Sequence, residues 1–463
     1  MSINDNFRYL NVGLPEDILR RKLWGDFDGA IRLIDQRLAA ETTPKGLAAC
    51  RRVQREMISR LGKDFPYSRE EAIALVREHI PDFTEEEFDR RVDEGKIRWI
   101  YVKGQMRIFD RFFASMCKSE PAFAQRAGVV TAGVESTGKD SHGIDLLNDA
   151  MAHMKSKGSM TTRIRIKAGL KLKDEQFTPG MFLRAHLPIP AACDQQSDIV
   201  IESVYPPSGK LSPADALQRT VCWEETMEEN HEFSVVYSYR HKAVYHDTDA
   251  IQADLSQPTF DTQEEEPHIV FTPYIRELVA TLSEGTDDPL EKARRFYDFI
   301  TINMKYTYMP AYFSLENIAE TCARSFTGDC GVFALLFLTM CRCAGIPAQW
   351  QSGLTAEPEF IGGHDWVRFY IAPYGWLYAD PSYGTGAVRV GNEERRRFYF
   401  GNLDAYRMVA NRAFQADFQV GKQHWRADPY DNQLGELESE NKGYAFDEYE
   451  RWKEILLCER IED

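Results

Sequence analysis

The sequence predicts an α+β protein, with helices and strands concentrated in different parts of the chain. Residues 14 to about 125 repeat apolar side chains every three or four positions, as amphipathic helices do. Between residues 160 and 255, short runs alternate apolar and polar side chains, as half-buried strands do. From residue 274 to about 411 the helical pattern and the strand pattern alternate along the chain. Because 463 residues exceed what one hydrophobic core holds, we expect two to four domains.

The N-terminal pattern predicts a helical region over residues 1–127. Its first apolar stripe consists of Leu19, Leu23, Phe27, Ile31, Ile34 and Leu38. Further helices are expected at residues 48–61, 69–79 and 85–92. Ser68 and Thr84 would cap the second and third of these, because Glu71 and Glu87 follow at the spacing of a capping box.

A short hairpin is expected at the end of this region, from residues 97–101 and 106–109 around Lys103-Gly104. The stretch from Gly128 to Gly143 contains glycine and serine and is typical of a linker. We therefore expect a linker and a helix over residues 128–159.

A small antiparallel β-sandwich is expected over residues 160–255. Its strands are expected at 162–171, 181–187, 198–204, 220–225 and 232–244. Turn signals such as Pro206-Pro207-Ser208-Gly209 separate them. The plainest interpretation of this domain is a packing or recognition module without chemistry of its own.

The third region is expected over residues 265–424, behind an acidic linker at 261–267. Its first helices should lie at 274–282 and 289–301. Residues 425–463 form an acidic C-terminal extension. We expect this extension to dock on the body through Tyr444, Phe446, Tyr449, Trp452 and Leu456.

Composition restricts the partners of the chain. Apolar residues make up 43% and aromatic residues 12%, as in a well-packed globular protein. The formal net charge is −16, with 72 acidic against 56 basic residues, so a phosphate backbone would be repelled and we expect no nucleic-acid partner. The N-terminus lacks the pattern of a signal peptide, and no apolar run reaches the roughly 18 residues of a membrane helix. The nine cysteines, an odd number, favour reduced thiols and a cytoplasmic location.

The first residue with a chemical signature is Cys330. It follows Gly328-Asp329 and opens a run of apolar residues that should form a buried helix ending before Gly345 and Pro347. Backbone N–H groups and the helix dipole favour an anion at such a position. We therefore expect a thiol with a lowered pKa and useful nucleophilicity, although a single cysteine is more often structural.

Two partners follow along the chain. His364 opens an alternating strand after Gly362-Gly363, and Asp380 closes what should be the neighbouring strand, sixteen positions later. An imidazole so placed can reach a helix N-terminus, and an aspartate beside it can fix its orientation and tautomer. The ordered set of helix and two adjacent strands predicts a catalytic triad of Cys330, His364 and Asp380.

These motifs together resemble the transglutaminase-like superfamily, a branch of the papain-like cysteine enzymes. The resemblance rests on Gly328-Asp-Cys330-Gly, Cys343-Ala-Gly-Ile-Pro-Ala348, His364-Asp-Trp366-Val, and Trp376 through Asp380-Pro381, and it covers about residues 289–406. Similar bacterial proteins also carry a stretch like that from Phe398 to Met408.

The resemblance implies a papain/transglutaminase-like catalytic domain. Cys330 would be the nucleophile, His364 the acid–base group and Asp380 the orienting acid, and the substrate would be an amide of a peptide or protein. No cofactor is implied. We find no cluster that resembles the calcium sites of animal transglutaminases, so the resemblance does not imply protein crosslinking.

Two rival interpretations were weighed. Cys330, Cys341, Cys343 and His364 are zinc-type ligands, but eleven helical residues separate the first two cysteines by about 16 Å, too far to share an ion. The second rival is a non-catalytic transglutaminase-like scaffold or binding protein. Within enzymes, hydrolysis, transfer to an amine, and deamidation or deglycosylation share one acyl-enzyme and stay open. We favour hydrolysis because water is always available.

A second oxyanion donor is expected upstream of Cys330, besides the N–H of Cys330 itself. The candidates are Tyr306 and Tyr308, which we expect on opposite faces of an extended segment. Tyr308 is preferred, because Pro310 keeps its end of the segment extended.

Overall fold

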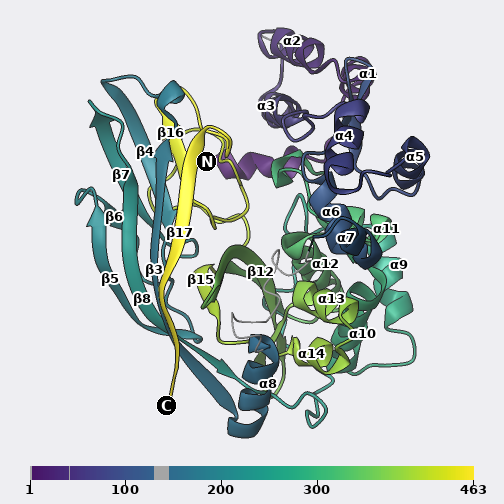
Figure 1. Cartoon of the computed structure of the whole chain (residues 1–463), viewed down its shortest axis with the longest axis vertical. Coiled ribbons are helices and arrows are strands. Elements are labelled where there is room, and N and C mark those ends of the chain that lie inside the picture. The colour runs from purple at the N-terminus through teal and green to yellow at the C-terminus, as the bar shows by residue number, and fades with distance from the viewer. Residues whose placement is uncertain (1–2, 41, 130–144, 463) are drawn as a thin grey trace.

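The computed structural model describes residues 3–40, 42–129 and 145–462. It combines helices and strands in separate layers and confirms the α+β class (Figure 1). Most of the expected linker between residues 128 and 143 lies outside the described residues. None of the described helices is both long and apolar enough to cross a bilayer.

The N-terminal residues form a helical cap beside the rest of the chain (Figure 1). Its elements are η1 (Ile3–Tyr9), α1 (Glu16–Trp24), α2 (Phe27–Leu38), α3 (Lys45–Arg60), α4 (Arg69–His79), α5 (Glu85–Asp93), β1 (Trp99–Val102), β2 (Gln105–Ile108), α6 (Phe112–Ser119) and α7 (Pro121–Arg126). Ser68 and Thr84 make the expected capping boxes with Glu71 and Glu87. The expected hairpin is present as the β1–β2 pair.

Two four-stranded sheets pack face to face on the other side of the molecule (Figure 1). One has the order β17-β3-β8-β5 and the other β16-β4-β7-β6. The strands are β3 (Ser159–Leu172), β4 (Met181–Pro188), β5 (Gln196–Tyr205), β6 (Lys210–Leu211), β7 (Thr220–Met227), β8 (Phe233–Val244), β16 (Glu436–Ser439) and β17 (Tyr449–Ile461). Helix α8 (Leu146–Lys157) precedes β3. Buried side chains from both sheets, among them Trp223, Tyr237 and Leu437, fill the space between them.

The C-terminal residues are not an extension that docks on a finished body, as the sequence had suggested for 425–463. They supply β16 and β17, one edge strand to each sheet. Five charged side chains of β17 are exposed, those of Glu450, Arg451, Glu454, Glu459 and Arg460, because an edge strand has a solvated outer face. That charge made the strand look like an acidic tail.

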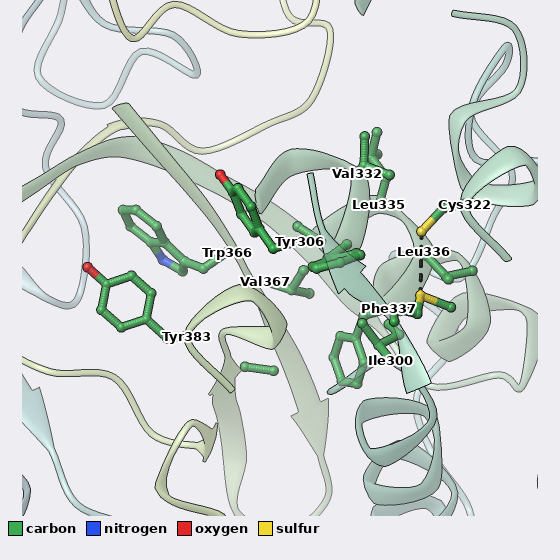
Figure 2. Close-up of a cluster of buried hydrophobic side chains, with 14 of the residues drawn as sticks. Ile300, Tyr306, Cys322, Val332, Leu335, Leu336, Phe337, Trp366, Val367 and Tyr383 are labelled. Carbon is green, nitrogen blue, oxygen red and sulfur yellow. Dashed lines mark hydrogen bonds between the residues drawn. The ribbon is translucent and has the colours of Figure 1, made fainter. Parts of the chain in front are cut away.

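The third body is built around one buried helix, α12 (Cys330–Cys343). Every α12 residue from Gly331 to Arg342 is buried, and Gly345 ends the turn that follows with φ +77°. Leu335, Leu336 and Phe337 of α12 meet Ile300 and Val367 in the core, as Figure 2 shows.

A five-stranded sheet of order β14-β13-β12-β11-β15 packs on this helix. The strands are β11 (Ala348–Glu357), β12 (Phe360–Ile371), β13 (Gly375–Ala379), β14 (Phe400–Gly401) and β15 (Arg407–Asn411). The other elements of the body are α9 (Pro273–Leu282), α10 (Pro289–Asn303), β9 (Lys305–Tyr306), η3 (Tyr312–Ser314), α11 (Ile318–Ser325), β10 (Thr327–Gly328), α13 (Pro381–Arg389) and α14 (Glu393–Phe398).

Residues 412–435, here called the return segment, run from β15 back to β16 and touch all three bodies. Arg60 of the helical cap donates to the carbonyl oxygens of Arg426 and Ala427. Gln218, just before β7, donates to the carbonyl oxygen of Tyr430. Gln433 reaches β12 of the central sheet. The end of the chain thus ties the three bodies together.

The pairing of β17 with β3 can be tested at Gly169, which lies directly opposite Trp452. A Cβ atom on Gly169 would stand 2.3 Å from the indole. We expect Gly169→Val to lower the free energy of unfolding by about 1–3 kcal/mol, and this cost should largely vanish in a Trp452→Ala background. Chemical denaturation of the four proteins measures the coupling.

Lys167→Val provides the matched control on the same strand and face, opposite Glu454, and should stay within about 0.5 kcal/mol of the wild type. An equal cost of Gly169→Val with and without Trp452 would show that the two side chains do not meet.

Candidate active site

Cys330 is the first residue of α12, at the mouth of the buried core. The side chain of Asp329 caps the helix by accepting a hydrogen bond from the Val332 N–H at 3.3 Å. Whereas residues Gly331 to Arg342 of the helix are buried, Cys330 is half-buried. The thiol is therefore at a helix N-terminus, where exposed backbone N–H groups favour a negative charge.

His364 and Asp380 are brought together by neighbouring strands. β12 and β13 pair antiparallel, and Asp380 follows the last residue of β13 as the N-cap of α13. His364 Nε2 lies 2.8 Å from Asp380 Oδ2, and both side chains are almost fully buried. Asp380 Oδ1 accepts from the Tyr383 N–H at 2.9 Å, so both carboxylate oxygens are held.

Arg407, which the sequence did not single out, completes this arrangement. Its guanidinium is fully buried and donates to Asp380 at 2.7 Å and to Asp404 at 2.6 Å. Burial would raise the pKa of Asp380, but the charges of His364 and Arg407 hold that pKa below its usual value. Arg407 lies within the stretch from Phe398 to Met408 quoted above, but nothing in that stretch marked the arginine as a residue of the site.

The thiol of Cys330 donates to a second carboxylate, that of Asp365, at 3.2 Å. Asp365 directly follows His364 on β12 and is 4% exposed. Burial, together with the neighbouring carboxyl of Asp431, raises the pKa of Asp365 well above its usual value. The approach of the His364 ring to the sulfur, which a triad requires, stays a prediction.

The return segment supplies the groups behind Asp365. The amide Nε2 of Gln433 donates to Asp365 Oδ1, to Asp431 Oδ2 at 3.0 Å and to the His364 carbonyl oxygen at 3.3 Å. The amide of Gln433 thereby bridges the carboxyls of Asp365 and Asp431. These contacts span about seventy residues of sequence, so no local pattern could have indicated them.

The expectation that Tyr306 and Tyr308 face opposite ways was wrong. Alternate residues of an extended segment lie on the same side, and the two rings meet edge to face with centroids 5.9 Å apart. Lys118 of α6 lies over both rings, 3.7 Å from the centroid of Tyr306 and 5.1 Å from that of Tyr308. Arg111 lies 3.3 Å from the Tyr308 centroid. The helical cap therefore holds this tyrosine pair.

A different tyrosine has its hydroxyl at the start of α12. The Tyr312 hydroxyl donates to Asp329 Oδ1, and a Cβ on Gly331 would stand 2.4 Å from it. Burial, then the nearby Asp329, Cys330 and Asp365, raise the pKa of Tyr312 well above its usual value, so it stays a neutral hydrogen-bond donor. Nothing in the sequence indicated Tyr312 beyond its place upstream of Cys330.

The described residues contain no group of three or more His, Cys, Asp or Glu side chains that could hold a metal ion. Burial of the whole side chain raises the pKa of Cys341 well above its usual value. That thiol packs in the core of α12, away from solvent.

Comparison with known proteins gives the following matches. The model of the transglutaminase-like superfamily matches residues 276–381, which span Cys330, His364 and Asp380. The Bacillus subtilis (strain 168) protein YebA, which is uncharacterized, is 25% identical over 129 residues; the match covers 24% of this chain and only 17% of YebA.

Two solved structures are similar in part. A candidate cysteine protease from Cytophaga hutchinsonii has 15% identity and a TM-score of 0.37, covering 64% of this chain and 91% of its own. The periplasmic domain of TgpA from Pseudomonas aeruginosa has 14% identity and a TM-score of 0.26, covering 54% and 96%.

The family match and the quoted motifs coincide. The match begins in α9 and ends at the first residue of α13, so it covers the nucleophile helix and the strands on either side of the His364–Asp380 pair. Residues 276–381 are therefore a transglutaminase-like core domain.

Proposed function

We propose that this protein is a cysteine-nucleophile enzyme that cleaves or transfers amide bonds of a peptide or protein through Cys330, His364 and Asp380. The observation that carries the proposal is the buried His364–Asp380 hydrogen bond of 2.8 Å, fixed from behind by Arg407. A buried imidazole whose Nε2 is committed to a carboxylate has its tautomer and plane set. The nitrogen left for chemistry is Nδ1.

In the proposed reaction, His364 Nδ1 takes the thiol proton as the Cys330 sulfur attacks the amide carbonyl carbon. The negative charge that develops on the carbonyl oxygen is stabilised by the Cys330 N–H and by one side-chain donor. His364 then gives the proton to the leaving nitrogen, which departs as an amine and leaves a thioester on Cys330. Water, activated by the same imidazole, releases the acid.

The acyl-enzyme on Cys330 can react with more than one second substrate. We favour hydrolysis, because any thioester open to solvent meets water at the highest concentration; transfer to an amine or removal of an amide side-chain group would use the same first half-reaction. The alternative is a transglutaminase-like scaffold without catalysis. The nine free cysteines support a reducing, cytoplasmic setting as part of the proposal.

The proposal predicts a selectively reactive thiol. With iodoacetamide near neutral pH, Cys330 should be alkylated at least about tenfold faster than Cys343, the half-buried thiol at the other end of α12. Peptide mass spectrometry after timed quenching measures each site. The same protein should release a burst of nitrophenolate from p-nitrophenyl acetate, absent in Cys330→Ala and kept in Cys343→Ala. Equal reactivity of the two thiols would favour the scaffold.

The orienting role of Asp380 can be separated from the stability of its ion network. Asp380→Asn should slow acylation by p-nitrophenyl acetate by about 10²-fold or more, because the amide holds the wrong imidazole tautomer. Asp404→Asn is the matched control, because Asp404 pairs with Arg407 whereas Asp380 pairs with both Arg407 and His364, and it should cost much less. If both variants lost the same fraction of the acylation rate, the ion network around Arg407 would serve folding alone.

The oxyanion donor can be identified among three tyrosines. Tyr308 and Tyr306 were the expected donors, but the geometry favours Tyr312, whose hydroxyl stands beside Gly331. Tyr312→Phe should slow acylation by p-nitrophenyl acetate by about 10²–10³-fold and leave alkylation by iodoacetamide nearly unchanged, because alkylation forms no oxyanion. Tyr306→Phe and Tyr308→Phe are matched controls. A loss confined to Tyr308→Phe would restore the first candidate.

A further inference from the structure

The proton of the resting Cys330 thiol is directed at a carboxyl that the proposed triad does not use. Cys330 Sγ donates to Asp365 Oδ2 at 3.2 Å, and the other oxygen of Asp365 accepts from Gln433. Both Asp365 and its neighbour Asp431 are at most 5% exposed. Asp365 is thus a buried carboxyl with both oxygens hydrogen-bonded, one of them to the thiol of Cys330, and the proposed triad does not explain this arrangement.

We propose that Asp365 is a positioning residue, paired with Asp431 and clamped by Gln433, that holds the Cys330 thiol in its protonated form until substrate and His364 take over the proton. The proposal rests on the proposed function, because it assumes that Cys330 is the nucleophile. No bond is made or broken by Asp365: in the reaction the proton moves from sulfur to His364.

The charges around Asp365 give the physical argument. Burial, and then the neighbouring carboxyl of Asp431, raise the pKa of Asp365 well above its usual value. When Asp365 is charged, it accepts the S–H and opposes a second negative charge on sulfur. When Asp365 is neutral, its hydroxyl can donate to the thiolate.

Other titratable groups around Asp365 also affect the ionisation of the thiol. Asp329 approaches from the cap of α12, Tyr312 comes from η3 and remains neutral, and His364 is adjacent on β12. From the return segment, burial and then the neighbouring Asp431 raise the pKa of Asp428 to about 8. The thiol is thus surrounded mainly by acids, which oppose the effect of the helix N-terminus.

The two carboxyls of the pair should have opposite effects on the thiol. Asp365→Asn removes the carboxyl that accepts the S–H and leaves an amide that can donate to a thiolate, so ionisation of the thiol becomes easier. Asp431→Asn removes the second cause, after burial, that raises the pKa of Asp365, so the charged form of Asp365 is less disfavoured and ionisation of the thiol becomes harder.

The test is the pH dependence of Cys330 alkylation by iodoacetamide, followed on the Cys330 peptide by mass spectrometry in the full chain. The midpoint should move to lower pH by about one unit in Asp365→Asn and to higher pH by about one unit in Asp431→Asn. Asp447→Asn, an exposed aspartate before β17, is the matched control and should leave the midpoint unchanged. Thermal melts check that each variant folds, and Asp365→Ser, which also removes the charge, replaces Asp365→Asn if the latter does not.

The outcomes separate this inference from the proposed function. Midpoints that shift in the same direction in both variants, or in neither, overturn the role of Asp365 while a fast-reacting Cys330 keeps the nucleophile. A wild-type Cys330 that reacts no faster than Cys343 overturns both.

Discussion

The guanidinium of Arg407 is buried completely, and a buried cation is tolerated only where carboxylates pair with it. Asp380 and Asp404 provide those partners, and the consequences extend across the central sheet. Asp380 follows β13 and Arg407 opens β15, and two strands, β12 and β11, lie between them. The arginine therefore spans the face of the sheet, and it adds a contact from β15 to those that Tyr383 and His364 make with Asp380. His364 takes its orientation from Asp380, so the imidazole depends on the completed sheet.

The return segment extends this dependence to the whole chain. It leaves β15, passes the helical cap at Arg60 and reaches β12 through Gln433 before it enters β16. The sandwich is closed by the two strands that follow. A transglutaminase-like core of about a hundred residues is thus joined to partners that come from both ends of the sequence. The sandwich packs beside this core because its last strands continue directly from the return segment, which contacts the candidate site through Gln433.

The sequence predicted what local patterns encode. Capping boxes at Ser68 and Thr84, the buried helix after Cys330, and the strand pair that joins His364 to Asp380 each rest on a period or a cap within about fifteen residues. The parts that could not be predicted depend on distant segments. Gln433 and Asp431 belong to no motif, Arg407 lies in a quoted stretch that did not reveal its role, and β17 resembled a tail because about half of its side chains face solvent. The tyrosine error had a different cause, since residues two apart on a strand share a face.

Two opposing electrostatic effects act on the thiol of Cys330, and their balance determines how readily the thiol ionises. The start of α12 favours a thiolate through its free N–H groups, with an effect that fades within one turn. Asp329, Asp365 and Asp431 oppose it from close range in a buried setting, where charge–charge interactions are strong. His364, which precedes Asp365 on β12, is hydrogen-bonded to Asp380 and not to these acids. The start of α12 and the buried acids therefore act on the sulfur in opposite directions, and the Cys330–Asp365 hydrogen bond lies where the two effects meet.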